Sequence, residues 1–168
     1  MAKTHRIAFQ LNGKPAAVDV EPRELLIHTL RERLAHTGPH IGCETSHCGA
    51  CTVDIDGSSV KSCTMLTVQC EGSDLITVEG LEQGGALHAI QQAFVDAHGL
   101  QCGFCTPGFI MATLELLRDN PQPSDEEIKA ALDGNLCRCT GYESILASVR
   151  LAAERLNTTR LAAVRVSA

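Results

Sequence analysis

The sequence predicts an α+β fold in two parts, a small sheet with one packed helix followed by a bundle of four helices. Residues 1–80 alternate apolar and polar side chains between turn signals, whereas residues 81–157 repeat apolar residues at helical spacing. Eight of the nine cysteines form two sets of four, one set in each part. We therefore expect two small domains, each built around one cysteine set, and a C-terminal tail over residues 158–168.

The first part contains the predicted strands. Residues 6–11 alternate apolar and polar side chains, and Asn12-Gly13 is a hairpin turn signal before a second strand over residues 16–20. Three further strands are expected at residues 52–55, 59–63 and 75–78.

One helix is expected to cover this sheet. Pro22 fits the first turn of a helix that runs to about Leu34. Leu26, Leu30 and Leu34, at positions i, i+4 and i+8, would give this helix one buried stripe. A loop rich in Gly, Ser, Thr and Cys follows over residues 38–51.

The second part is predicted to be helical. Helices are expected at residues 86–97, 106–118 and 143–156, and a further helix before the last one should contain Ile128 and Leu132. Thr106 with Pro107 suggests an N-cap followed by an N1 proline, and Ser124 with Glu127 forms a capping box. Short connections make neighbouring helices antiparallel, so the two loops that carry cysteines should meet at one end of the bundle.

Composition limits the classes of function. With 44% hydrophobic residues and no tryptophan, two small domains would bury little area and would gain stability from bound metal. A net charge of −6 without a Lys/Arg run argues against nucleic acid and anionic membranes as partners. No leader and no long apolar segment is present, which predicts a cytoplasmic protein without membrane insertion. In that reducing compartment nine cysteines indicate metal ligands rather than disulfides.

The first set comprises Cys43, Cys48, Cys51 and Cys63, with the spacing C-x4-C-x2-C-x11-C. A [2Fe–2S] cluster takes four thiolates, and this spacing is that of plant-type ferredoxins. Neighbouring glycines would let backbone N–H groups approach the cluster sulfides. The alternative is structural zinc, although zinc sites usually pair two C-x2-4-C knuckles.

The second set comprises Cys102, Cys105, Cys137 and Cys139, reading C-x2-C, 31 intervening residues and C-x-C. This spacing fits either zinc or iron, and the C-x2-C does not open the βαβ unit of a thioredoxin. Its occurrence beside the first set favours a second [2Fe–2S] cluster and an electron relay. The alternative function is a zinc-stabilised scaffold or adaptor without redox activity.

The remaining candidates carry no chemistry of their own. Cys70 lies in a mostly apolar stretch and is expected to be a small buried hydrophobe. No histidine has the setting of a Rieske ligand, and His47 is expected on the loop surface. The sequence has no Ser/His/Asp arrangement, no G-x-G-x-x-G and no P-loop, so we expect no catalytic residue in this chain.

Three segments together resemble the iron–sulfur subunit of the molybdenum hydroxylases, the xanthine oxidase family. They are residues 42–53 (GCETSHCGACTV), 101–108 (QCGFCTPG) and 134–142 (GNLCRCTGY), and the resemblance covers residues 5–157. Residues 45–47 and 52–57 are most similar to the small subunit of aerobic carbon monoxide dehydrogenase. Subunits of N-heteroaromatic hydroxylases such as quinoline oxidoreductase are similar as well.

The resemblance implies a ferredoxin-like β-grasp domain that faces a flavin protein and a helical domain next to a molybdenum–pterin cofactor. Electrons would pass singly from molybdenum through the helical-domain cluster and the ferredoxin-type cluster to FAD. Gln101 matches a residue that contacts the pterin, with Cys139 close to it; otherwise Gln101 is an ordinary loop residue. A chain of 168 residues leaves no room for either further cofactor. The expected partners are a large molybdenum-cofactor subunit and a medium FAD subunit, in a dimer of heterotrimers.

Overall fold

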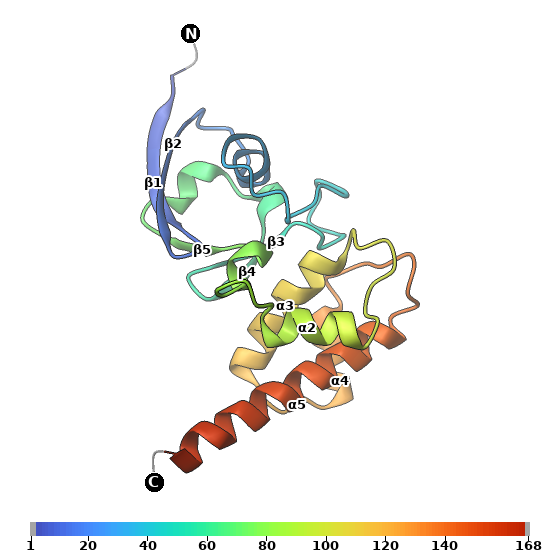
Figure 1. Ribbon diagram of the computed structural model, residues 1–168. Coiled ribbons are helices and arrows are strands. Elements are labelled where there is room, and N and C mark those ends of the chain that lie inside the picture. Colours follow the sequence, from blue (N-terminus) through green and yellow to red (C-terminus); the bar gives the residue numbers. More distant parts are fainter. Residues whose placement is uncertain (1–2, 167–168) are drawn as a thin grey trace.

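The computed structural model describes the backbone of residues 3–166 and the side chains of residues 3–158. The chain forms two parts, a small β-sheet with its helix and a group of four helices (Figure 1). The predicted fold class, a β-grasp domain followed by a four-helix domain, is confirmed. None of the described helices has both the length and the hydrophobicity of a membrane span.

A five-stranded sheet forms the first part, in the order β2-β1-β5-β3-β4. The strands are β1 (His5–Leu11), β2 (Lys14–Val20), β3 (Thr52–Ile55), β4 (Ser58–Lys61) and β5 (Asp74–Ile76). β1 and β2 form an antiparallel hairpin around the predicted Asn12-Gly13 turn, whereas β5 runs parallel to β1 and antiparallel to β3. All five predicted strands are present. β4 and β5 end earlier than predicted because each is followed by a 3-10 turn, η2 (Ser62–Thr64) and η4 (Val78–Leu81).

The helix of this part is shorter than predicted. α1 (Leu26–His28) continues into one π-helical turn, η1 (Thr29–Arg33), and begins four residues after Pro22. The segment just before α1 is extended because it pairs with residues that follow β4. Leu26 and Leu30 are fully buried, as expected. The core around them comprises Ile7, Phe9, Leu11, Val20, Val53, Leu75 and, as predicted, Cys70, which lies in the 3-10 turn η3 (Thr67–Cys70).

The second part contains the four predicted helices. They are α2 (Ala89–Asp96), α3 (Thr106–Asp119), α4 (Asp125–Leu132) and α5 (Glu143–Val166). α2 begins three residues later than predicted, because Gly84 and Gly85 form a turn at positive φ and His88 caps the helix. Ser124 and Glu127 form the predicted capping box of α4. The shared core includes Ile90, Phe94, Phe109, Met111, Ile128, Ile145 and Val149.

The last helix is longer than predicted. The last helix was expected to end near residue 156, but α5 continues to Val166, and positions 167–168 lie outside the described residues. No glycine or proline follows residue 156 to stop the helix. Asn157 also anchors this turn, since its amide Nδ2 donates to the Pro121 carbonyl at 2.7 Å.

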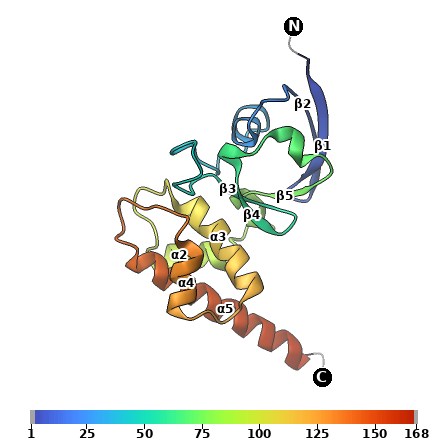
Figure 2. The same cartoon turned by 180° about the vertical axis from the view of Figure 1, so that it is seen from behind.

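α3 joins the two parts, lying against β3 and β4, with the other helices beyond it (Figure 2). The Arg118 guanidinium donates to the buried Asp54 carboxylate at 3.0 Å and also to the carbonyl of Gly57. Near the start of α3 the backbones approach so closely that a Cβ on Gly108 would lie 2.1 Å from the Gly49 carbonyl oxygen. Gly49 belongs to the loop over residues 38–51, which carries Cys43, Cys48 and Cys51 and is called the first cysteine loop below. The contact therefore brings this loop onto the helical domain.

Candidate metal centres

The first cysteine loop is fastened at both ends. At its start, the Arg31 guanidinium donates to the carbonyls of Thr37 and Pro39, at 2.6 and 2.8 Å. At its end, the His40 N–H donates to the Ala50 carbonyl at 2.9 Å, which closes the loop before β3. The cysteines are thereby held in a compact loop that lies beside the start of α3 in both views (Figures 1 and 2).

The four cysteines of the first set lie close together. Cys51 and Cys63 are buried, and Cys43 and Cys48 are half-buried. The N–H groups of Thr45 and Cys48 each donate to Cys43 Sγ at 3.4 Å. A hydrogen bond from the Thr45 side chain, with these backbone bonds, lowers the pKa of Cys43 to about 6. Burial, followed by the neighbouring Cys63 thiol, raises the pKa of Cys51 to about 11.

This contrast fits a metal site. Cys43 is prepared as a thiolate by its hydrogen bonds, whereas burial makes ionisation of Cys51 unfavourable without a cation. A bound metal ion supplies that charge and deprotonates coordinating thiols.

The second set comes from two loops at the same end of the helical domain, as predicted (Figure 1). Cys105 is the N-cap of α3, one residue before the predicted Thr106. Cys137 follows α4 and is fixed from two sides. Its N–H donates to the Tyr142 hydroxyl at 3.0 Å, and its Sγ accepts from the Thr140 hydroxyl at 3.1 Å and the Thr140 N–H at 3.4 Å.

The thiols of the second set are arranged in pairs. Cys102 Sγ and Cys139 Sγ are 3.6 Å apart, and the Cys105 and Cys137 thiols also form a hydrogen bond. Two sulfurs on one tetrahedral metal lie about 3.8 Å apart for metal–sulfur bonds of about 2.3 Å. Burial, then the Cys137 thiol, raises the pKa of Cys105 to about 12. Burial acts to raise the pKa of Cys137, but the hydrogen bonds from Thr140 outweigh burial, and the pKa of Cys137 lies below its usual value.

The donor set fits [2Fe–2S] clusters. A [2Fe–2S] cluster takes two thiolates on each iron, which the paired thiols of the second set can supply. Next to Cys105, the Thr106 hydroxyl is buried without a hydrogen-bond partner among the described residues. Buried donors normally have partners, so this hydroxyl is suited to a group that the protein itself does not supply.

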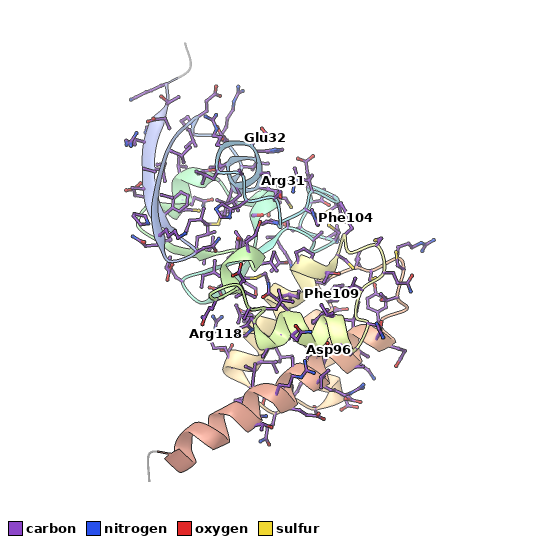
Figure 3. The ribbon with its side chains drawn as sticks, viewed as in Figure 1. Arg31, Glu32, Asp96, Phe104, Phe109 and Arg118 are labelled. Atoms are coloured by element: carbon purple, nitrogen blue, oxygen red, sulfur yellow. The ribbon has the colours of Figure 1, made fainter. Side chains whose placement is uncertain are left out.

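Hydrogen bonds join the first cysteine loop directly to the loop that carries Cys137 and Cys139. The Leu136 N–H donates to the Cys48 carbonyl at 2.9 Å, and the Asn135 amide Nδ2 donates to the Gly49 carbonyl at 3.1 Å. A further contact is made by Phe104, which is labelled in Figure 3. The ring of His40 stacks on that of Phe104, with the ring centroids 4.6 Å apart. Leu136, which directly precedes Cys137 of the second set, thus contacts Cys48 of the first set.

The sequence analysis did not identify these bridging residues. Asn135 and Leu136 lie in the segment 134–142 that carries the family resemblance, but neither they nor His40 were given a role, because their contacts form only when the loops meet. Gln101, predicted to contact a pterin, is exposed beside Cys102. Its role stays a prediction. His47 is exposed on the loop surface, as predicted.

Two protein families match the chain in succession. Residues 9–77 match the family described as a 2Fe-2S iron-sulfur cluster binding domain, and residues 77–150 match that described as a [2Fe-2S] binding domain. The predicted presence of two [2Fe–2S] sites is thereby confirmed. The zinc alternative gains no support from these matches.

Related proteins match over nearly the whole chain. The gamma subunit of caffeine dehydrogenase from Pseudomonas sp. strain CBB1 is 47% identical over 152 residues, which are 88% of this chain and 90% of that protein. The small subunit of nicotine 6-hydroxylase from Paenarthrobacter nicotinovorans is 49% identical over 143 residues, 85% of this chain and 86% of that one. The crystal structure of quinoline 2-oxidoreductase from Pseudomonas putida 86 matches with a TM-score of 0.90 and 46% identity, covering 94% of this chain and 98% of the matched chain.

Proposed function

Because this chain belongs to the family of small [2Fe–2S] electron-transfer subunits of the molybdenum hydroxylases, we propose that its eight paired cysteines hold two clusters and relay electrons between them. Cys43, Cys48, Cys51 and Cys63 would hold one cluster, and Cys102, Cys105, Cys137 and Cys139 the other. The hydrogen bond from the Leu136 N–H to the Cys48 carbonyl carries this proposal. When bound, each cluster accepts and releases one electron at a time.

The residues of this chain provide a short covalent and hydrogen-bonded connection between the two sites. Leu136 directly precedes Cys137, and its N–H reaches the carbonyl of Cys48 itself. Asn135 holds the same two loops in register through the Gly49 carbonyl. This chain's contribution to turnover is therefore to fix the separation and surroundings of two redox centres, which set their potentials and exchange rate.

The second site faces the molybdenum-cofactor subunit in our proposal. Cys102 and Cys139 are exposed, and so are three large apolar side chains nearby: Phe104, Leu136 and Tyr142. Exposed apolar side chains beside a redox centre suit coverage by another chain. Gln101, next to Cys102, would contact the pterin there. The β-grasp domain would face a medium FAD subunit, and the whole would assemble as a dimer of heterotrimers in the cytoplasm.

We further propose that the substrate of the complex is an N-heteroaromatic compound rather than carbon monoxide. The three relatives above are named for caffeine, nicotine and quinoline, and each of these molecules contains a nitrogen heterocycle. Identities of 46–49% over most of each chain support a common class of reaction. The substrate pocket itself would lie on a partner chain.

The relay is tested on the natively purified complex. Cys102→Ser should remove one of two [2Fe–2S] EPR signals and abolish turnover, and Cys43→Ser should remove the other. Persistence of both signals in either variant would refute the ligand assignment. Turnover of the wild-type complex with N-heteroaromatic compounds and with carbon monoxide then tests the substrate class, and mass spectrometry of the co-purifying chains tests the partners.

A further inference from the structure

One cation, Lys61, lies where the first cysteine loop meets the loop that carries Cys137 and Cys139. Lys61 ends β4, two residues before Cys63, and its side chain is half-buried. Its ammonium donates to the Thr52 hydroxyl at 2.8 Å and to the Asn135 amide oxygen at 3.4 Å. Both partners are neutral and buried. Among the described residues, no carboxylate forms an ion pair with Lys61 within 4.0 Å.

The ammonium is held by a closed ring of hydrogen bonds. Thr52 Oγ1 donates to the Gly49 carbonyl at 2.6 Å, and Asn135 Nδ2 donates to the same carbonyl at 3.1 Å. The Lys61 ammonium closes the ring by donating to Thr52 Oγ1 and to Asn135 Oδ1. Gly49 lies between Cys48 and Cys51, so the ring fixes the charge beside the first site.

The position of Lys61 in the sheet shows which site its charge affects. Lys61 pairs with Thr52 in the antiparallel register of β3 and β4, and Thr52 directly follows Cys51. Along its own strand, Lys61 lies two residues before Cys63. The positive charge is therefore flanked by two cysteines of the first set.

We propose that Lys61 raises the reduction potential of the first cluster and so directs electrons from the second cluster to the first. Four thiolates, two sulfides and two ferric ions carry a net charge of about −2, and the added electron makes it about −3. A fixed cation in a partly desolvated site stabilises the more negative state. One electron leaves the second cluster and one enters the first, with no proton transferred. This inference rests on the proposed relay.

The experiment is an EPR-monitored redox titration of the natively purified complex. Lys61→Met keeps a chain of similar length but removes the charge, and it should lower the midpoint potential of the first cluster. The expected change is about tenfold in the one-electron equilibrium between the clusters, or about 59 mV. Lys61→Arg keeps the charge and should preserve the wild-type potential. Lys61→Gln is a second neutral variant, for use if Lys61→Met does not assemble.

Lys14→Met is the matched control, because Lys14 is exposed on β2, at the opposite edge of the sheet from β4. It should leave both potentials unchanged. The inference would be overturned if the midpoint potential of the first cluster were unchanged in Lys61→Met and Lys61→Gln. It would also be overturned if Lys61→Arg lowered this potential as much as the neutral variants do, because geometry and not charge would then set it. A wild-type complex without two [2Fe–2S] signals would instead refute the relay.

Discussion

Cys51 and Cys63 are 1% and 2% exposed, whereas Cys102 and Cys139 are open to solvent. The first site is partly covered by one continuous loop, its flanking strands and the helical domain, which leave Cys43 and Cys48 half-buried. The second is assembled from two loops at one end of the helices. A site that its own chain largely covers has more of its electrostatics fixed by that chain, and a site that is more open is completed by whatever covers it. The two sites are thus suited to different neighbours along one electron path.

The domain interface that holds them together also has two unlike ends. At one end of α3 a charged pair spans the domains, Arg118 with the buried Asp54. At the other end no charged pair is involved, and the backbone at Gly108 lies close against that at Gly49. Figure 3 shows the two ends through Arg118 and through Phe104, which precedes α3. Predictions at the two ends separate electrostatic from steric control of the interface.

The largest effect is expected at the charged end. Arg118→Met would leave the Asp54 carboxylate buried, with a side chain 2% exposed, and without its cation. Removing one partner of a buried ion pair costs about 3–5 kcal/mol, and partial exposure of Arg118 places this variant near 3 kcal/mol. Urea denaturation of the cluster-loaded chain measures the change in the free energy of unfolding.

Arg150→Met is the comparison for this prediction. Arg150 pairs with Asp125 at 2.7 Å, but the side chains are 41% and 50% exposed. An exposed pair contributes about 0–1 kcal/mol. Equal losses in the two arginine variants would show that burial of Asp54 is unimportant.

At the steric end, Gly108→Ala should destabilise the chain although alanine normally favours a helix by about 1 kcal/mol over glycine. The new Cβ would lie 2.1 Å from the Gly49 carbonyl oxygen, so the first cysteine loop must move away from α3. Overpacking of this kind costs about 1–3 kcal/mol. The EPR signal of the first cluster should change shape as its loop is displaced.

Gly134→Ala provides the control, because its Cβ would have only the end of the flexible Lys61 side chain nearby, with Nζ at 3.6 Å and Cε at 3.9 Å. Its free energy of unfolding should stay within about 0.5 kcal/mol of the wild type. A stabilised Gly108→Ala chain would contradict the close approach of the two domains.

The sequence was sufficient for the features that depend on local chemistry. The strands around Asn12-Gly13, the capping box at Ser124 and the two loops carrying the second cysteine set all follow from spacing and turn chemistry, and all are present. The start of α1 could not be predicted, because the segment before it pairs with residues some forty positions later. The role of Lys61 was hidden for the same reason, since its partner Asn135 lies in the other domain.

The smallest effect is expected for the two threonines that donate hydrogen bonds to cysteine sulfurs, one at each site. Thr140 donates from its hydroxyl to Cys137 Sγ at 3.1 Å, and the Thr45 side chain donates to the Cys43 thiolate. Hydrogen bonds to cluster sulfurs stabilise the more negative reduced state and raise the potential. Thr140→Val should therefore lower the potential of the second cluster alone, and Thr45→Val that of the first alone. Each shift should be smaller than about 59 mV, the equivalent of a tenfold change. Redox titration of both signals measures this, and a shift of both clusters in either variant would mean that the two sites do not have separate surroundings.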